Sequence, residues 1–77
     1  MPLTGREREV AALVARGYTN REVARALTIG ERTVATHVEH ILEKLAMTSR
    51  AQIAAWAAKR RSEMESATYR TGASIAR

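Results

Sequence analysis

The sequence predicts an all-α fold, a bundle of four helices, on two observations. One helix-start signal occurs three times, a hydroxyl residue followed three positions later by Glu or Gln, at Thr4 and Glu7, Thr19 and Glu22, and Ser49 and Gln52. In such a capping box the first side chain accepts from a free backbone N–H, and the second accepts from the N–H of the cap residue. In addition, residues 30–46 keep their large apolar side chains on one side of a 3.6-residue period.

Four helices are therefore expected in order along the chain. The first spans residues 5–16 and ends at Gly17, because glycine readily takes the left-handed conformation that closes a helix. The second spans residues 20–27, the third 31–45 and the fourth 50–61.

The third helix has an apolar and a polar side. Its inward-facing residues recur at helical spacing and are Val34, Val38, Ile41, Leu42 and Leu45. The opposite arc is polar and contains Arg32, Thr36, Glu39, His40 and Glu43. Thr28 and Glu31 also have the capping-box spacing, so the sequence alone leaves the first residue of this helix undetermined by two positions.

Only Thr28, Ile29 and Gly30 separate the second helix from the third. Two helices joined by so short a turn, of which the second is long and amphipathic, are typical of a helix-turn-helix. The small side chain of Ala24 would let the two helices cross closely, although alanine is also simply a good helix former.

Composition limits the kind of protein. A chain of 77 residues makes one small domain. Ligand clefts usually need more surrounding structure than such a domain supplies, so an enzyme is not expected. Cysteine is absent, which excludes disulfides and cysteine-bound zinc. No apolar run approaches the roughly 18 residues of a membrane span, and no signal-peptide segment begins the chain, so we expect a cytoplasmic protein.

The positive charge is concentrated in the periodic part of the chain. The net charge is +5, and residues 1–61 contain eleven Lys and Arg against six acids, whereas residues 62–77 contain two of each. A basic small domain favours nucleic acid or an anionic surface as partner, although solubility alone is an alternative explanation of such a charge. Because residues 62–77 contain few large apolar side chains, we predict a domain over 1–61 and a disordered tail over 62–77.

Several separated blocks together resemble one known family. They are LTGREREV, the turn at Gly17, TNREVA, TV followed two residues later by HV, ILEKL, and SR, and they span Leu3 to Ala58. In this combination the chain resembles the LuxR-type, or GerE-like, DNA-binding domain. The resemblance implies a four-helix bundle with a helix-turn-helix, whose third helix enters the major groove of double-stranded DNA. It also implies a transcription regulator, of which this domain is usually the C-terminal output part, without a cofactor or small-molecule ligand of its own.

The resemblance also implies which residues act. By position, the base-reading residues of the family fall on Ala35, Thr36 and Glu39, with His40 nearby. Glu39 would accept from a cytosine N4 amine, and the methyl groups of Ala35 or Thr36 would touch thymine. The expected phosphate-binding residues lie on the second helix and at the starts of the third and fourth, and are Asn20, Arg21, Arg25, Arg32, Thr33 and Arg50.

In the family the fourth helix commonly mediates dimer contacts, which implies a homodimer here. The corresponding helix has a smooth, uncharged stripe formed by Ala51, Ala54, Ala55 and Ala58. Such a stripe would suit close helix packing, but alanines on a solvated helix look the same.

The chain departs from the family pattern at several points. A Lys commonly follows the Thr-Val pair, where this chain has Ala35, and residues 31–44 carry three acids against two bases. Attraction to phosphate must therefore come from elsewhere. Gly30 replaces the usual Ser cap, and Ala46 stands where glycine often ends the helix. A left-handed alanine there would cost about 1 kcal/mol.

Three alternatives remain at this point. His37, His40 and Glu43 have a spacing that could hold a metal on one helix turn, but three ligands on a surface arc make a poor site, and no metal is expected. A small helical module with an acidic exposed helix could instead bind a basic protein. The promoter-reading region of a sigma factor has a similar helix-turn-helix, although the extended HVEHILEKLAMTSR block is not expected there.

Overall fold

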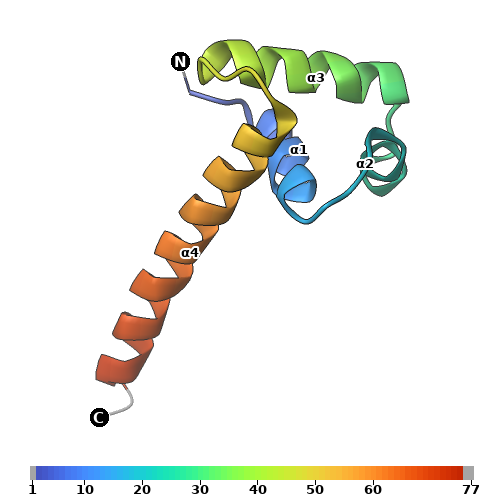
Figure 1. Cartoon of the computed structure of the whole chain (residues 1–77). Helices are drawn as coiled ribbons and strands as arrows, with labels where there is room; N and C mark the ends of the chain where they lie inside the picture. The colour runs from blue at the N-terminus through green and yellow to red at the C-terminus, as the bar shows by residue number, and fades with distance from the viewer. Residues whose placement is uncertain (1, 76–77) are drawn as a thin grey trace.

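The computed structural model describes the backbone of residues 2–75 and the side chains of residues 2–63. The chain forms four helices, α1 (Gly5–Ala15), α2 (Asn20–Leu27), α3 (Glu31–Lys44) and α4 (Arg50–Ile75), and the described residues contain no strand. Helix α1 lies at the centre and packs against both α3 and α4, while α2 packs mainly beneath the first turns of α3 (Figure 1). The predicted all-α fold with a helix-turn-helix is confirmed.

The predicted capping boxes form at the starts of α1 and α2. The Glu7 N–H donates to Thr4 Oγ1 at 3.1 Å, and the Thr4 N–H donates to Glu7 Oε1 at 2.9 Å. Thr19 and Glu22 repeat this exchange at 3.1 and 2.8 Å. Each box satisfies two backbone donors that the first helical turn leaves without partners.

The start of α4 is capped in the same way. The structure also shows at which residue α3 begins. The Gln52 N–H donates to Ser49 Oγ at 3.3 Å, while Gln52 Oε1 accepts from the Ser49 N–H at 3.1 Å. Helix α3 begins at Glu31, with Gly30 in the cap position and no side-chain cap. The alternative start at Thr28 is therefore wrong.

Three helix ends are closed by a left-handed residue, at Gly17 (φ 89°), Thr28 (φ 56°) and Ala46 (φ 53°). At the end of α3, the Met47 N–H donates to the Leu42 carbonyl at 2.8 Å and the Ala46 N–H to the Glu43 carbonyl at 3.2 Å. This pair of bonds is the Schellman arrangement, which normally uses glycine. The left-handed turn that usually needs glycine therefore forms here with alanine.

The core lies where the four helices meet. Its buried apolar residues are Leu3, Val10, Ala11, Val14, Val23, Ala24, Val34, Ile41 and Ile53. Ala24 is buried in this core, and its carbonyl accepts from the Ile29 N–H at 3.0 Å, which closes the end of α2. The other residues of the predicted third helix that were expected to face inward, Val38, Leu42 and Leu45, are half-buried and pack around the core, as do Leu13 and Trp56. Sequence periodicity alone did not identify Leu3 and Ala11.

The predicted helix ends need correction in three places. Helices α1 and α3 end one residue earlier than predicted, at Ala15 and Lys44. Helix α4 does not end at residue 61 but continues to Ile75 and projects beyond the bundle (Figure 1). The added segment contains no proline, and a helix that has already begun can continue through its single glycine, Gly72. Met1 of the predicted domain and residues 76–77 of the predicted tail lie outside the described residues. The domain boundary at residue 61 stays a prediction.

Replacing Ala46 by glycine should stabilise the domain. The Ala46→Gly variant removes the Cβ from a left-handed residue, so we expect the free energy of unfolding to rise by about 0.5–1 kcal/mol. Ala12→Gly is the matched control, because Ala12 is exposed inside α1, where glycine should lower the free energy of unfolding by about 1 kcal/mol. Urea unfolding measures both, and a loss of stability for Ala46→Gly would contradict the assignment.

Candidate nucleic-acid interface

The outer side of α3 faces solvent along its whole length. Arg32, Thr33, Thr36, Glu39 and His40 are exposed, and Ala35 is half-buried beside them. Val34 and Ile41 are fully buried on the opposite side and fix the rotation of the helix about its axis. The predicted polar arc is therefore one continuous accessible surface.

Two of the predicted base-reading residues have restricted chemistry. The Thr36 hydroxyl donates to the Arg32 carbonyl of its own helix at 3.1 Å, so its proton is already engaged. The Glu39 carboxylate has no hydrogen bond or ion pair with any described residue, and an ionised carboxylate can only accept. Together they offer a methyl group and an acceptor, but no donor, to an approaching ligand.

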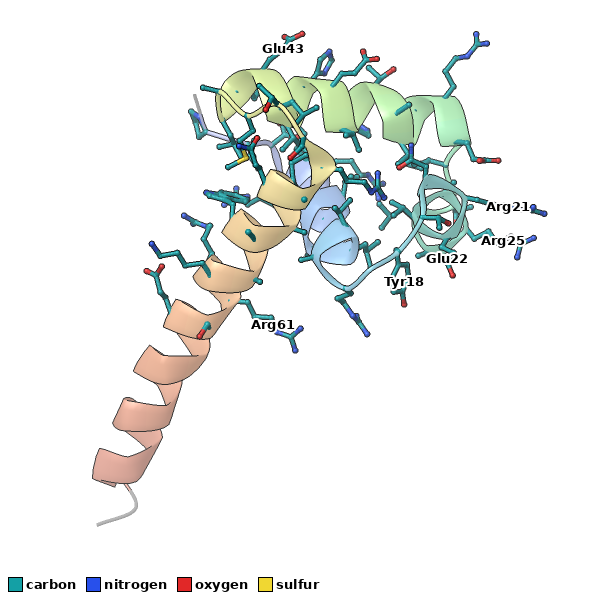
Figure 2. All side chains as sticks on the ribbon, in the orientation of Figure 1. Tyr18, Arg21, Glu22, Arg25, Glu43 and Arg61 are labelled. Carbon is teal, nitrogen blue, oxygen red and sulfur yellow. The ribbon has the colours of Figure 1, made fainter. Side chains whose placement is uncertain are left out.

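Helix α2 provides an exposed basic patch beside the first turns of α3. Arg21 and Arg25 are one helical turn apart and point away from the bundle on the same side (Figure 2). The labelled acid Glu43 lies on α3 at the end far from α2 (Figure 2). The exposed bases Arg21, Arg25 and Arg32 therefore lie at one end of α3, among the acids Glu22 and Glu31, whereas the exposed acid Glu43 lies at the other end.

Asn20 and Arg50 have a different environment from the other predicted phosphate-binding residues. Both are half-buried, and Arg50 Nη1 donates to Asn20 Oδ1 at 2.6 Å. Arg50 Nη2 also donates to the Tyr18 carbonyl at 2.7 Å. These bonds join the start of α4 to the start of α2. Sequence reasoning did not foresee this link.

A buried carboxylate joins α1 to the end of α3. Glu7 is only 3 % exposed, and besides its capping box it accepts from Lys44 Nζ at 2.7 Å. His40 Nδ1 lies 3.9 Å from the other oxygen, Glu7 Oε2. Sequence reasoning placed Glu7 in a capping box but missed its partner, because the two residues are far apart in sequence. The only sequence feature that pointed to this pair was Lys44, a base in the last turn of a helix that carries three acids.

The contacts of Glu7 shift its ionisation. The hydrogen bond from Lys44 and the one from the Thr4 backbone lower the pKa of Glu7 below its ordinary value of 4.5, more than burial raises it. Glu7 is therefore charged at neutral pH. Lys44 is held against it and does not add its charge to the outer side of α3, where Glu39 and Glu43 are exposed.

The predicted dimer stripe on α4 is only partly accessible. Ala51, Ala55 and Ala58 are exposed, whereas Ala54 is half-buried and packs on the core. Ala58 also lines a shallow hollow between α1 and α4, opposite Ala12 and Ala15 of α1. Three of the four predicted residues are thus available for contact.

Two further features of the described residues are the histidines of α3 and the apolar content of the helices. His37 is half-buried while His40 is exposed, and no group of three His, Asp or Glu side chains in the described part of the chain could hold a metal ion. Nor is any described helix long and apolar enough to span a bilayer.

Glu7→Gln should destabilise the domain in a pH-dependent way. At pH 7 we expect a loss of about 1.5–3 kcal/mol in the free energy of unfolding, because Lys44 loses a charged acceptor. The folded-state pKa is lowered, so this contribution is complete above the ordinary pKa of Glu7 and is lost as the pH falls through the lowered value.

Urea unfolding between pH 7 and pH 3 measures the difference between the wild type and Glu7→Gln. Glu9→Gln is the control, because Glu9 is exposed and pairs only with Arg6 at the surface, and its effect should stay below about 0.5 kcal/mol. A wild-type advantage that does not shrink in acid would contradict the assigned pair.

Comparison with known proteins agrees with this architecture. The family described as bacterial regulatory proteins of the luxR family matches residues 1–57. The nitrate/nitrite response regulator NarL of Escherichia coli K12 is 46% identical over 54 residues, 70% of this chain and 25% of NarL. The response regulator VraR of Staphylococcus aureus Mu3 is 47% identical over 55 residues, 71% of this chain and 26% of VraR.

A third relative is much longer. The putative helix-turn-helix transcriptional regulator Mb0914c of Mycobacterium bovis is 43% identical over 58 residues, 75% of this chain but 7% of that protein. The chain thus spans between 7% and 26% of the length of these relatives. The match to the family covers the four-helix core and the helix-turn-helix, and the chain belongs to the luxR family of bacterial regulatory proteins.

Proposed function

We propose that this chain binds double-stranded DNA sequence-specifically, with α3 in the major groove, and so regulates transcription. The observation that carries the proposal is the arrangement of the helix-turn-helix. Helix α3 is fixed by its buried side, its polar side is fully accessible, and the arginines of α2 flank its first turns. This is how a helix-turn-helix presents a recognition helix, whose N-terminal residues reach the base edges. Membership of the luxR family supports the same function.

In this proposal, affinity and selectivity come from different helices. Phosphate contacts supply most sequence-independent affinity. Because Lys44 is paired with Glu7, α3 adds only Arg32 to the exposed positive charge, together with the hydroxyl of Thr33. Arg21 and Arg25 therefore provide the principal phosphate attraction, while α3 selects the sequence.

The reading face of α3 favours particular bases. Glu39 can only accept, so it suits the exocyclic amine of cytosine or adenine and is repelled by the O6 and N7 acceptors of guanine. Since the Thr36 hydroxyl donates to the Arg32 carbonyl, its methyl group is the part left for contact with a thymine methyl. Ala35 and His40 are the neighbours of Thr36 and Glu39 in the chain.

A salt titration tests the function. Affinity for a duplex should fall steeply as salt rises, with a slope of about −0.9 in log K against log salt for each phosphate contact. Arg21→Gln and Arg25→Gln should each reduce that slope by about 0.9 and weaken binding to all sequences alike. Lys59→Gln is the control for net charge, because Lys59 is exposed on α4. A salt-independent affinity would refute DNA binding.

Glu39→Ala should instead change sequence preference. Selection from a random duplex library, before and after the substitution, should show relaxed preference at one base pair, worth about 1–3 kcal/mol of discrimination. The salt slope should not decrease, because no positive charge is removed. If Glu39→Ala weakened all sequences equally while Arg21→Gln changed the preference, the assigned roles would be reversed and the proposal wrong.

We further propose that the chain is the output domain of a longer regulator and acts as a dimer through α4. The relatives it matches are about four or more times its matched length, which supports the first point. The exposed alanines Ala51, Ala55 and Ala58 support the second, because small side chains let helices approach closely. As a DNA-binding domain it would work in the cytoplasm and need no cofactor.

Ala55→Glu tests the dimer. A charge in the middle of the stripe should lower affinity for a duplex with two half-sites, because the two copies would no longer bind as a unit. Affinity for a single half-site and stability in urea should not change, and these serve as internal controls. Equal affinity of wild type and variant for the two-half-site duplex would remove α4 from the interface.

A further inference from the structure

We propose that Arg50 is a positioning residue for DNA binding, which acts through Asn20 and does not itself contact a phosphate. This inference rests on the proposed function. It assigns Arg50 a role different from the direct phosphate contact expected from the sequence, and it follows from the two hydrogen bonds that its guanidinium makes within the protein.

The guanidinium spans the cap of α2. Nη1 donates to Asn20 Oδ1 at 2.6 Å and Nη2 donates to the Tyr18 carbonyl at 2.7 Å. Thr19, the cap residue of α2, lies between these two acceptors in the chain. Because the guanidinium is planar and rigid, two parallel bonds from it hold the residues on both sides of the cap in one orientation.

The bond to Asn20 also decides which way its amide faces. Arginine has donors and no acceptor, so the atom facing Nη1 must be the amide oxygen. The amide nitrogen of Asn20 is then directed away from Arg50, and none of the described residues accepts from it. Arg50 thereby presents a donor, and not an acceptor, beside Arg21. A phosphate oxygen requires a donor.

The connection before α2 is held from its other side as well. The Arg16 guanidinium lies over the Tyr18 ring, 5.6 Å from its centroid, while Arg50 binds the carbonyl of the same residue. The cap of α2 is therefore fixed relative to both α1 and α4. Arg21 immediately follows Asn20 and points away from the bundle (Figure 2), so it projects from the helix start that this attachment holds.

A double-mutant cycle separates positioning from direct contact. Wild type, Arg50→Gln, Asn20→Ala and the double variant are compared for affinity to a duplex selected from the library, at several salt concentrations. We expect Arg50→Gln to raise Kd about five- to tenfold in the wild type but less than about twofold in the Asn20→Ala background, because coupled residues are not additive. A direct phosphate contact would give equal effects in both backgrounds and a salt slope smaller by about 0.9.

Arg50→Lys provides a second discriminating variant. A phosphate is readily bound by a lysine as a point charge, so a direct contact would be largely restored. Positioning needs the planar fork, so Arg50→Lys should bind as weakly as Arg50→Gln. Lys59→Gln, which changes the net charge equally at a site on α4, should leave Kd within about twofold.

The outcomes distinguish this inference from the proposed function. If the wild type binds with a steep salt dependence but the cycle is additive, or Arg50→Lys restores affinity, DNA binding stands and the positioning role is overturned. If the Arg50 variants lose stability in urea while their folded fraction binds like wild type, the role is structural only and the inference is also overturned. If Arg50→Gln does not fold, Asn20→Ala alone must raise Kd without loss of stability. A wild type that shows no salt-dependent binding would refute both proposals.

Discussion

The position of α3 depends on one carboxylate. Glu7 completes the capping box of α1 and also accepts a hydrogen bond from Lys44 in the last turn of α3. A single buried charge therefore fixes the start of one helix and the end of another. The apolar core beneath them is non-directional, because hydrophobic burial rewards removal from water and not a particular orientation. A charged hydrogen bond at 2.7 Å does specify an orientation. Burial of Val34 and Ile41 sets which side of α3 faces outward, and the bond from Lys44 to Glu7 fixes the end of the helix against α1.

The two ends of α3 are also set by turns whose left-handed residue is not glycine. Thr28 before the helix and Ala46 after it both have left-handed backbones. For a β-branched residue such as Thr28 this conformation is rare, and it persists only where the surrounding structure requires it. Ile29 and Met47, the residues that follow, donate to the carbonyls of Ala24 and Leu42 and pack on the core. Their burial helps to offset the backbone strain.

Local features of the sequence predicted more of this molecule than distant ones. The three capping boxes, the short turn and the apolar side of α3 could be read directly, because each depends on residues within one or two helical turns. The bonds from Lys44 to Glu7 and from Arg50 to Asn20 join residues 37 and 30 positions apart, and no periodicity reports them. The end of α4 was missed for a different reason. Composition indicated that residues 62–77 cannot bury an apolar face, but a helix that has already begun can continue without one.

The ion pair between Lys44 and Glu7 would affect how strongly such a domain prefers its target site over other DNA. It leaves Glu39 and Glu43 exposed on α3 without a compensating base on the same helical turns. Binding to arbitrary DNA is almost entirely electrostatic, so an acidic reading helix weakens it at every site. At a matching site the proposed base contacts of α3 would offset that penalty, whereas elsewhere nothing would. The ratio of specific to non-specific affinity, which governs occupancy among millions of competing sites, would thereby be raised even though the absolute affinity would be lower.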